Sequence, residues 1–130
     1  MRKLRVIISK GPEDYGAWIE KFPGVYGAGE TVAEVKKNLK EGLKLYVKHN
    51  EVADWVKNKD YELIYKYDGQ SFLNYFKGIF TNAALERISG INQRQINHYA
   101  TGRKKPRPEQ LKKLETGIHK LASELMAVEL

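Results

Sequence analysis

The sequence predicts an α+β domain of order β-β-β-α-β over residues 1–68 and an all-α domain over residues 71–130. Two patterns predict this division. Strand-like segments occur before residue 68, apolar at residues 4–8, alternating at 15–20 and rich in aromatic residues at 61–67, whereas the pattern beyond residue 71 is helical throughout. The polar segment Asp68-Gly69-Gln70-Ser71 lies between them as the expected boundary. A chain of 130 residues has room for two such small domains.

Four strands are expected in the first domain. The run LRVII at residues 4–8 is apolar enough for a buried central strand. Residues 15–20 alternate in the manner of a strand with one covered face, and a third, short strand is expected at 25–28, ended by Gly27 and Gly29. Residues 61–67 (YELIYKY) predict the fourth strand, which is rich in aromatic side chains.

One amphipathic helix is expected between the third and fourth strands. Thr31 can cap its N-terminus, and Glu34 can complete a capping box. Asn50 is the expected end, and Trp55 and Val56 are expected to anchor the connection to the fourth strand. The apolar stripe that should pack on the sheet consists of Val32, Val35, Leu39, Leu43, Tyr46 and Val47.

The composition restricts the class of protein. The chain has no cysteine, which excludes disulfides and thiolate metal sites and favours a reducing, cytoplasmic location. No apolar run approaches the roughly 20 residues of a membrane span, and the N-terminus lacks the apolar core of a signal peptide. We therefore expect a cytoplasmic protein without a membrane partner.

The net charge of +7 is concentrated in the second half. Between Arg87 and Lys113 the chain has eight basic residues and a single acid, Glu109. Such a block attracts a polyanion, with nucleic acid as the first candidate and an acidic partner or membrane surface as the next. A solvated basic face that promotes solubility is the alternative explanation.

The second domain is expected to begin with two helices. Phe72, Leu73, Tyr75, Phe76 and Ile79 predict a first helix with a buried side. Residues 81–89 predict a second helix whose inward residues are Ala84, Leu85 and Ile88.

The run GINQRQINHYATG at residues 90–102 predicts a helix with an exposed polar face. Gly90 can take the positive φ that a sharp turn requires, and Asn92 can cap the next helix, from Gln93 to Thr101, with Gln95 helping to close the cap. Ile91 and Ile96 are spaced as a hydrophobic staple. Because Ile96, Tyr99 and Ala100 face inward, Arg94 and His98 point the other way and can bond to base edges in a major groove.

The basic loop RKKPRP at residues 103–108 can bind phosphates, and its prolines keep it out of a helix. Together with the preceding helix, this loop contains the candidate DNA-binding residues Asn92, Gln93, Arg94, Gln95, Asn97, His98, Arg103, Lys104, Lys105 and Arg107. An ordinary helical bundle with a basic loop is the alternative interpretation.

A last helix is expected to start near Pro108. Its apolar stripe consists of Leu111, Leu114, Ile118, Leu121, Leu125 and Val128. This stripe is longer than a domain of about 60 residues requires, so we expect part of it to bind a second copy.

Residues 81–108 resemble the helix-turn-helix domains of the XRE (Cro/C1-type) family. The matching positions are Leu85, Gly90, Ile91, Gln93, Ile96, Gly102, Lys105 and Pro106. Glu86 departs from the pattern, since a small residue usually packs there between the two helices, and different packing is therefore expected at this point.

Residues 4–67 resemble the HicB antitoxin domain. The resemblance rests on three motifs in a fixed order: Tyr15-Gly16-Ala17-Trp18, Phe22-Pro23-Gly24-Val25, and Gly29-Glu30-Thr31 with Glu34 and Val35. Val35 stands at a position where alanine is common in that family.

The two resemblances imply an antitoxin of a type II toxin–antitoxin system. Its N-terminal domain, a partial ribonuclease-H-like fold, would neutralise a HicA-type mRNA-cleaving toxin. Its C-terminal domain would bind double-stranded operator DNA and repress its own operon. Such antitoxins form homodimers or higher homo-oligomers. The alternative is a stand-alone transcriptional regulator whose N-terminal domain serves oligomerisation or sensing.

An RNA-directed enzyme is the third hypothesis, and the residues speak against it. Ribonuclease H chemistry requires clustered carboxylates that hold divalent metal ions. The run LRVII contains none, and Glu13, Asp14 and Glu20 are scattered. His49, His98 and His119 lack metal-ligand spacing. We therefore expect no catalytic residues, no metal and no cofactor.

Overall fold

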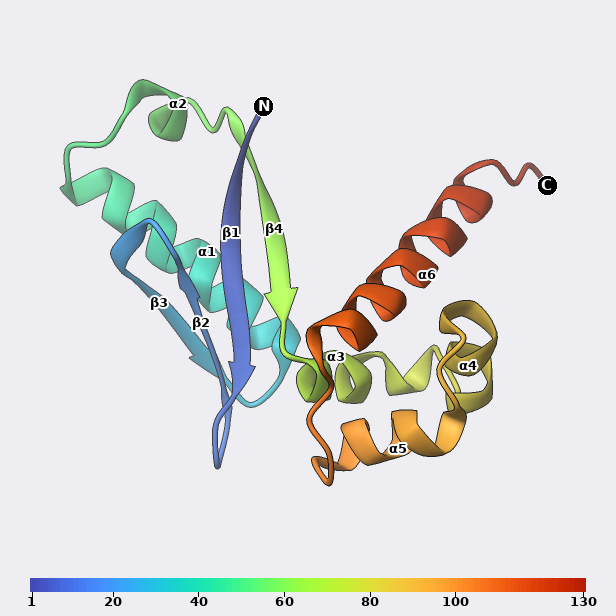
Figure 1. The fold of residues 1–130 in the computed structure, drawn as a ribbon. Coiled ribbons are helices and arrows are strands. Elements are labelled where there is room, and N and C mark those ends of the chain that lie inside the picture. Colours follow the sequence, from blue (N-terminus) through green and yellow to red (C-terminus); the bar gives the residue numbers. More distant parts are fainter. The chain divides into compact units, whose positions relative to one another are not determined.

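The computed structural model describes all residues, 1–130, and the chain divides into two compact units, Met1–Asp68 and Gly69–Leu130. The predicted α+β fold class is confirmed. One four-stranded mixed sheet and six α-helices make up the chain (Figure 1).

The sheet has the strand order β3-β2-β1-β4. β1 pairs with β2 in antiparallel and with β4 in parallel orientation, and β2 pairs with β3 in antiparallel orientation. The strands are β1 (Arg2–Lys10), β2 (Tyr15–Ile19), β3 (Phe22–Gly29) and β4 (Tyr61–Tyr67).

Only one face of this sheet is covered within the first unit. In β1 the side chains of Leu4, Val6 and Ile8 are buried, whereas Arg5 between them is exposed and Ile7 is half-buried. Residues 4–8 therefore lie in a central strand, as expected, but only one face of that strand is buried rather than both. β1 has a partner on each side, but its second face carries polar and apolar side chains that no helix of this unit covers.

Helix α1 (Val32–His49) lies along the covered face (Figure 1). Its N-terminus is capped by Thr31, whose Oγ1 accepts a hydrogen bond from the Glu34 N–H at 3.1 Å. The Glu34 carboxylate accepts from the Glu30 N–H at 3.0 Å, one residue before the cap. The apolar stripe packs into the first core, which contains Leu4, Val6, Ile8, Ala17, Ile19, Val25, Val32, Val35, Leu39 and Leu43.

The close approach of α1 to β3 explains why position 27, within β3, is a glycine. Gly27 was expected to help end a strand over residues 25–28, yet β3 runs from Phe22 to Gly29. A Cβ at Gly27 would lie 2.6 Å from the backbone N of Leu39 and 3.0 Å from the carbonyl O of Val35. Glycine is therefore required because the helix backbone lies directly against the strand.

The connection from α1 to β4 contains the short helix α2 (Asp54–Lys57). Val56 in this helix is buried, and the ring of Trp55 packs edge-on against Tyr61 with 6.4 Å between the ring centroids. Trp55 thus holds this segment against the start of β4, and Val56, the other residue expected to anchor it, is buried.

The second unit is entirely helical and has its own core of Leu73, Leu85, Ile91, Ile96, Tyr99 and Leu114. Its elements are α3 (Gly69–Tyr75), the 3-10 helix η1 (Phe76–Gly78), α4 (Asn82–Ser89), α5 (Gln93–Thr101) and α6 (Pro108–Met126).

The two units divide between Asp68 and Gly69, within the segment expected as the boundary, and α3 begins at Gly69, two residues before the expected start of the second domain. One expectation for this unit was wrong. Ile79 does not lie on the buried side of the first helix. It follows η1 and is 73% exposed, because the helix narrows into a 3-10 turn and ends before it.

None of the helices combines the length and the apolar character that crossing a bilayer requires.

Candidate nucleic-acid interface

The segment Gly90–Asn92 joins α4 to α5 through local backbone chemistry. Gly90 ends α4 with φ of 78°, the left-handed conformation that glycine adopts without strain, and its N–H bonds to the Glu86 carbonyl. Asn92 then caps α5, its Oδ1 accepting from the Arg94 N–H at 2.8 Å. The boundaries of α5 follow from these two residues and from Gly102, whose φ of 82° ends the helix.

The short connection is fixed to the core by Ile91. Its side chain is 3% exposed and lies in the same core as Ile96 at 0%. The Ile91 N–H donates to the hydroxyl of Ser89, which in turn donates to the Leu85 carbonyl at 2.6 Å. The side chain of Ile91 is therefore buried and its backbone N–H is hydrogen-bonded. Together these contacts set the direction in which α5 leaves the turn.

Glu86 ties the two helices together. Its Oε1 accepts a hydrogen bond at 2.8 Å from the backbone N–H of Gln93, the first residue of α5. The N–H groups of a first helical turn have no partner within their own helix. A carboxylate supplied by the preceding helix satisfies one of them and also opposes the positive end of the helix dipole. This contact explains why a longer, acidic side chain stands at a position where a small one was expected.

The inward side of α5 is formed by Ile96 and Tyr99, both buried. The Tyr99 hydroxyl accepts hydrogen bonds from Gln95 Nε2 at 3.0 Å and from Gln110 Nε2 of α6 at 3.3 Å. Gln95 is half-buried and occupied by this contact, so it does not help to close the cap as the sequence suggested. It also turns its amide toward Tyr99 rather than toward solvent.

Asn74 of α3 supports the other end of α5, and sequence reasoning missed it. Its Nδ2 donates to the carbonyl of Gln70 in its own helix and to the carbonyl of Ala100 in α5, each at 2.9 Å. The only sequence signal is an amide within the aromatic run from Phe72 to Phe76. Its partner lies 26 residues away, so no local pattern could identify it.

An open hollow of about 660 Å³ lies along the polar side of α5. Six of the predicted site residues line it: Asn92, Gln93, Arg94, Gln95, His98 and Lys104. The other four, Asn97, Arg103, Lys105 and Arg107, are exposed but do not line it. The hollow is thus formed by the first turns of α5 together with one residue of the loop that follows.

His98 lies in a strongly cationic environment. Desolvation and the charges of Arg103, Lys104 and Arg94 lower the pKa of His98 from its ordinary value of 6.5. Its Nδ1 is buried and has no hydrogen-bond partner, although the residue as a whole is only half-buried. The lowered pKa favours the neutral imidazole at pH 7, whose two ring nitrogens are one donor and one acceptor.

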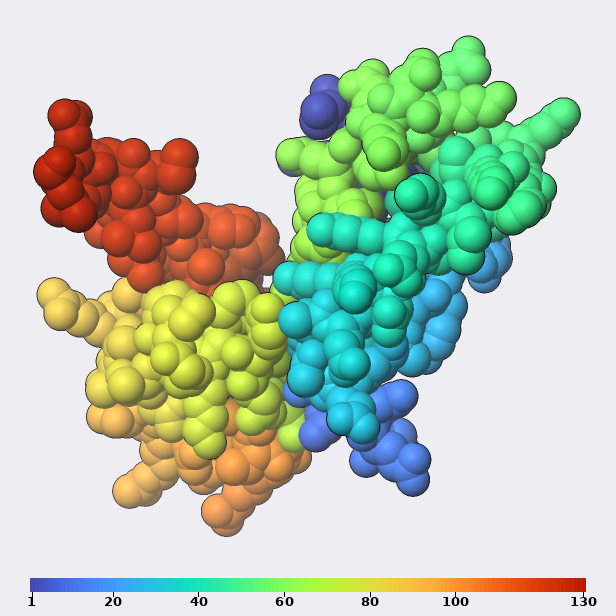
Figure 2. All heavy atoms as spheres, turned by 180° about the vertical axis from the view of Figure 1, so that it is seen from behind, coloured from blue at the N-terminus to red at the C-terminus, as the bar shows by residue number.

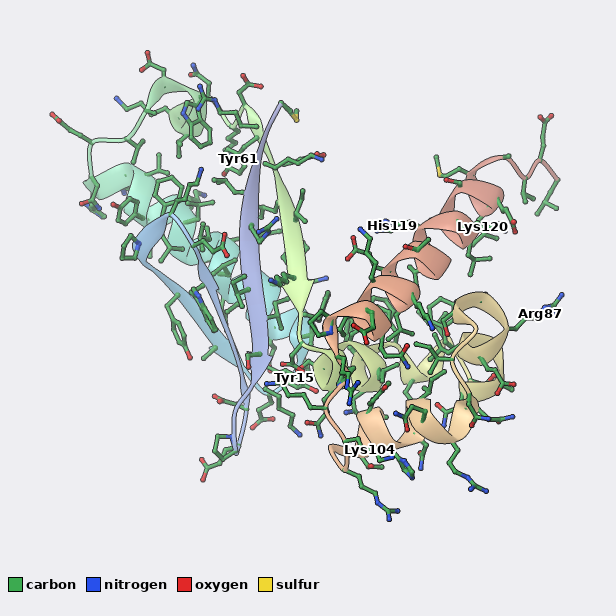
Figure 3. All side chains as sticks on the ribbon, in the orientation of Figure 1. Tyr15, Tyr61, Arg87, Lys104, His119 and Lys120 are labelled. Carbon is green, nitrogen blue, oxygen red and sulfur yellow. The ribbon has the colours of Figure 1, made fainter.

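The loop between α5 and α6 holds its basic side chains in solvent. Lys104 anchors the loop through its backbone N–H, which donates to the His98 carbonyl at 3.1 Å, and the side chain extends outward (Figure 3). Arg87 projects from α4 in the same unit, away from the core (Figure 3). The exposed basic residues of the loop itself are Arg103, Lys104, Lys105 and Arg107.

A second exposed surface is the uncovered face of the sheet in the first unit. Trp18 of β2 is 41% exposed, and its register partners are Tyr26 of β3 and Ile7 of β1. Tyr26 is 60% exposed and lies across Gly16, where a Cβ would be 2.7 Å from the Tyr26 hydroxyl oxygen. We name Trp18, Tyr26 and Ile7 the aromatic patch.

The His, Asp and Glu side chains form no cluster that could hold a metal ion.

Comparisons of this chain with protein-family models, with curated proteins and with solved structures found no match.

We expect Glu86→Ala to destabilise the second unit by about 1 kcal/mol, since it removes a charge-assisted hydrogen bond and leaves the Gln93 N–H without its partner. Glu86→Gln retains a carbonyl oxygen at this position and is expected to cost roughly half as much. Urea unfolding followed by circular dichroism measures both variants. Equal stability of Glu86→Ala and wild type would show that the contact contributes nothing.

Proposed function

We propose that this protein binds double-stranded DNA through α4 and α5, acting as a helix-turn-helix, with α5 in the major groove. One observation carries the proposal: the polar side of α5 borders an open hollow beside a loop of four exposed basic side chains. A major groove admits a single α-helix, and hydrogen-bonding side chains on that helix distinguish the base pairs. Basic side chains beside it would bind the phosphates and set the register.

Individual residues suit different parts of this task. Arg94 is exposed at the second position of α5, and a guanidinium can bond to guanine O6 and N7 together. Asn97 is exposed one turn further along the helix. Gln95 is less suited to base contacts than its position suggested, because the Tyr99 hydroxyl already occupies its amide. The side-chain oxygen of Asn92 is occupied by capping α5. Asn92 would therefore contribute to DNA binding by orienting α5 rather than by contacting a base.

We further propose that the protein is a HicB-like antitoxin that represses its own operon and neutralises a HicA-type mRNA-cleaving toxin through its N-terminal domain. The motifs from Tyr15 to Val35 suggest this class. The aromatic patch supports a protein partner, since exposed large apolar side chains grouped on one face are typical of interaction sites. A stand-alone regulator would use the first unit for oligomerisation or sensing instead.

We expect Arg94→Ala and Lys104→Ala to weaken DNA binding in different ways. Loss of a base contact costs about 1–3 kcal/mol and relaxes the preference at one base pair, whereas loss of a phosphate contact weakens all duplexes alike and lowers the salt slope by about 1. Fluorescence anisotropy with the promoter of the protein's own gene and with random DNA, at several salt concentrations, separates the two effects. An Arg94→Ala variant with unchanged affinity and preference would contradict the proposed role of α5.

We expect DNA affinity to rise as the pH falls from 7.5 to 5.5. Desolvation, together with the charges of Arg103, Lys104 and Arg94, lowers the pKa of His98 in the free protein, and nearby phosphates in the complex would offset the charges and raise it. The complex then holds more protons than the free protein, so acid favours binding, by up to roughly tenfold for each unit of pKa difference. His98→Gln should reduce this pH dependence, and an equal dependence in both proteins would argue against contact between His98 and DNA.

Co-expression with a small basic protein encoded beside this gene tests the antitoxin proposal. We expect a stable complex that Trp18→Ala weakens by about 2 kcal/mol or more, the usual effect of removing a central aromatic contact. Leu45→Ala is the matched control, because Leu45 is a similarly exposed apolar residue on α1, outside the aromatic patch. If no such gene or no complex is found, the alternative of a stand-alone regulator is favoured.

A further inference from the structure

The first residues of β1 have a strand neighbour on only one side. Pairing of β1 with β4 begins at Arg2, whereas pairing with β2 begins only at Val6, because β2 ends at Ile19. β1 and β4 therefore extend together beyond the end of β2 (Figure 1). From behind, the dark-blue start of the chain lies beside the green segment that contains α2 and the start of β4 (Figure 2). The edge of β1 at residues 2–4 is thus open where a longer β2 would have paired.

The backbone of Lys3 is directed at this open edge. The Arg5 carbonyl accepts a hydrogen bond at 3.3 Å from the N–H of Glu20, the residue that follows β2. Backbone groups alternate in direction along a strand, so Lys3, two residues before Arg5, directs its N–H and C=O to the same side. β2 has already turned away there. An unpaired donor and acceptor at a strand edge are a template for an added strand.

A hollow of about 240 Å³ lies at the same edge. Three consecutive residues of β1 line it together with the three residues at the end of β2, so it lies where the shorter strand stops. With one residue of β4 added, the lining consists of Lys3, Leu4, Arg5, Ile19, Glu20, Lys21 and Ile64.

The charges at this hollow favour an acidic occupant. Its exposed side chains include three cations, Lys3, Arg5 and Lys21, and a single acid, Glu20. Arg5 Nη1 lies 3.9 Å from Glu20 Oε2 and both side chains are about half exposed, so this pair offsets at most one of the three cations. Carboxylates that approach from this side would be attracted.

An extended peptide matches both the edge and the charges. It has the regular alternation of N–H and C=O groups that pairs with a strand edge, and a sugar-phosphate chain does not. Its alternate side chains point to opposite faces of the sheet. Those on the open face would meet the cations, and those on the other face would approach Leu4 and Ile19, which are buried apolar residues. Acidic residues alternating with apolar residues fit this arrangement.

We propose that the open edge of β1 at residues 2–4 binds an extended segment of another protein, in which acidic residues alternate with apolar residues, as an added strand of the sheet. None of the residues of the aromatic patch lines the hollow, so the two surfaces are distinct. Binding at this edge also does not require the DNA-binding helices of the proposed function.

Fluorescence anisotropy of the full chain with a labelled peptide of about seven residues, in which glutamate alternates with valine, tests this site. We expect this peptide to bind and a peptide with lysine in place of glutamate not to bind. Lys3→Glu should weaken binding by about tenfold or more, because it opposes the peptide with a like charge. Lys66→Glu is the matched control, since it makes the same charge change on the open face of β4, outside the hollow. At physiological salt it should change the affinity by less than about threefold.

Hydrogen exchange followed by NMR tests the added strand itself. Saturation with the peptide should slow exchange of the Lys3 amide by about tenfold or more, because that N–H becomes paired. Unchanged exchange would overturn the proposal, and so would absence of binding at about 1 mM peptide. Tighter binding of a single-stranded oligonucleotide of equal charge would overturn it in favour of nucleic acid. A Lys3 amide that is already protected without peptide, increasingly so at higher protein concentration, would show that a second copy occupies the edge instead.

Discussion

The position of α5 depends on the burial of Ile96 and Tyr99 against the core of the second unit. Ile96 has no exposed surface and Tyr99 only 3%, so rotation of α5 about its axis would expose both and bury its polar side. The hydrogen bonds at the two ends of α5 stabilise this orientation but do not determine it. Glu86 and Asn92 satisfy the first turn, and Asn74 holds the last. The outward direction of Arg94 and Asn97 is thus a consequence of what the opposite side of the helix buries.

Local chemistry allowed much of this region to be predicted. Gly90, Asn92 and Gly102 act through their own backbone or a neighbouring N–H, and the structure begins and ends α5 at the residues that these signals indicate. The contacts that sequence reasoning missed are non-local. Glu86 reaches the first residue of the next helix, Gln110 of α6 reaches Tyr99 of α5, and Asn74 reaches Ala100, and none of these pairings has a periodic signal.

In the sheet, too, prediction from the sequence succeeded for one strand and failed for another. Alternation along β2 correctly predicted a covered face, because period-two patterns report burial directly. The run at residues 4–8 did not, since apolar Ile7 lies on the open face beside Trp18 and gives the strand a more buried composition than its surroundings. Composition alone does not distinguish an apolar residue on an interaction surface from an apolar residue in the core. The positions of Ile7 on the open face of the sheet and of Ile79 in solvent could therefore not be predicted from the sequence.

The contact of Tyr26 with Gly16 constrains how this protein can diverge. The phenol ring occupies the space that any side chain at position 16 would need, so the two positions share one volume. A Cβ at position 16 would require the Tyr26 ring to move, and a ring that is 60% exposed can turn into solvent. Related chains with a larger residue at position 16 should therefore have either a smaller residue at position 26 or a tyrosine turned away from the sheet, so the shape of the open face would differ among them.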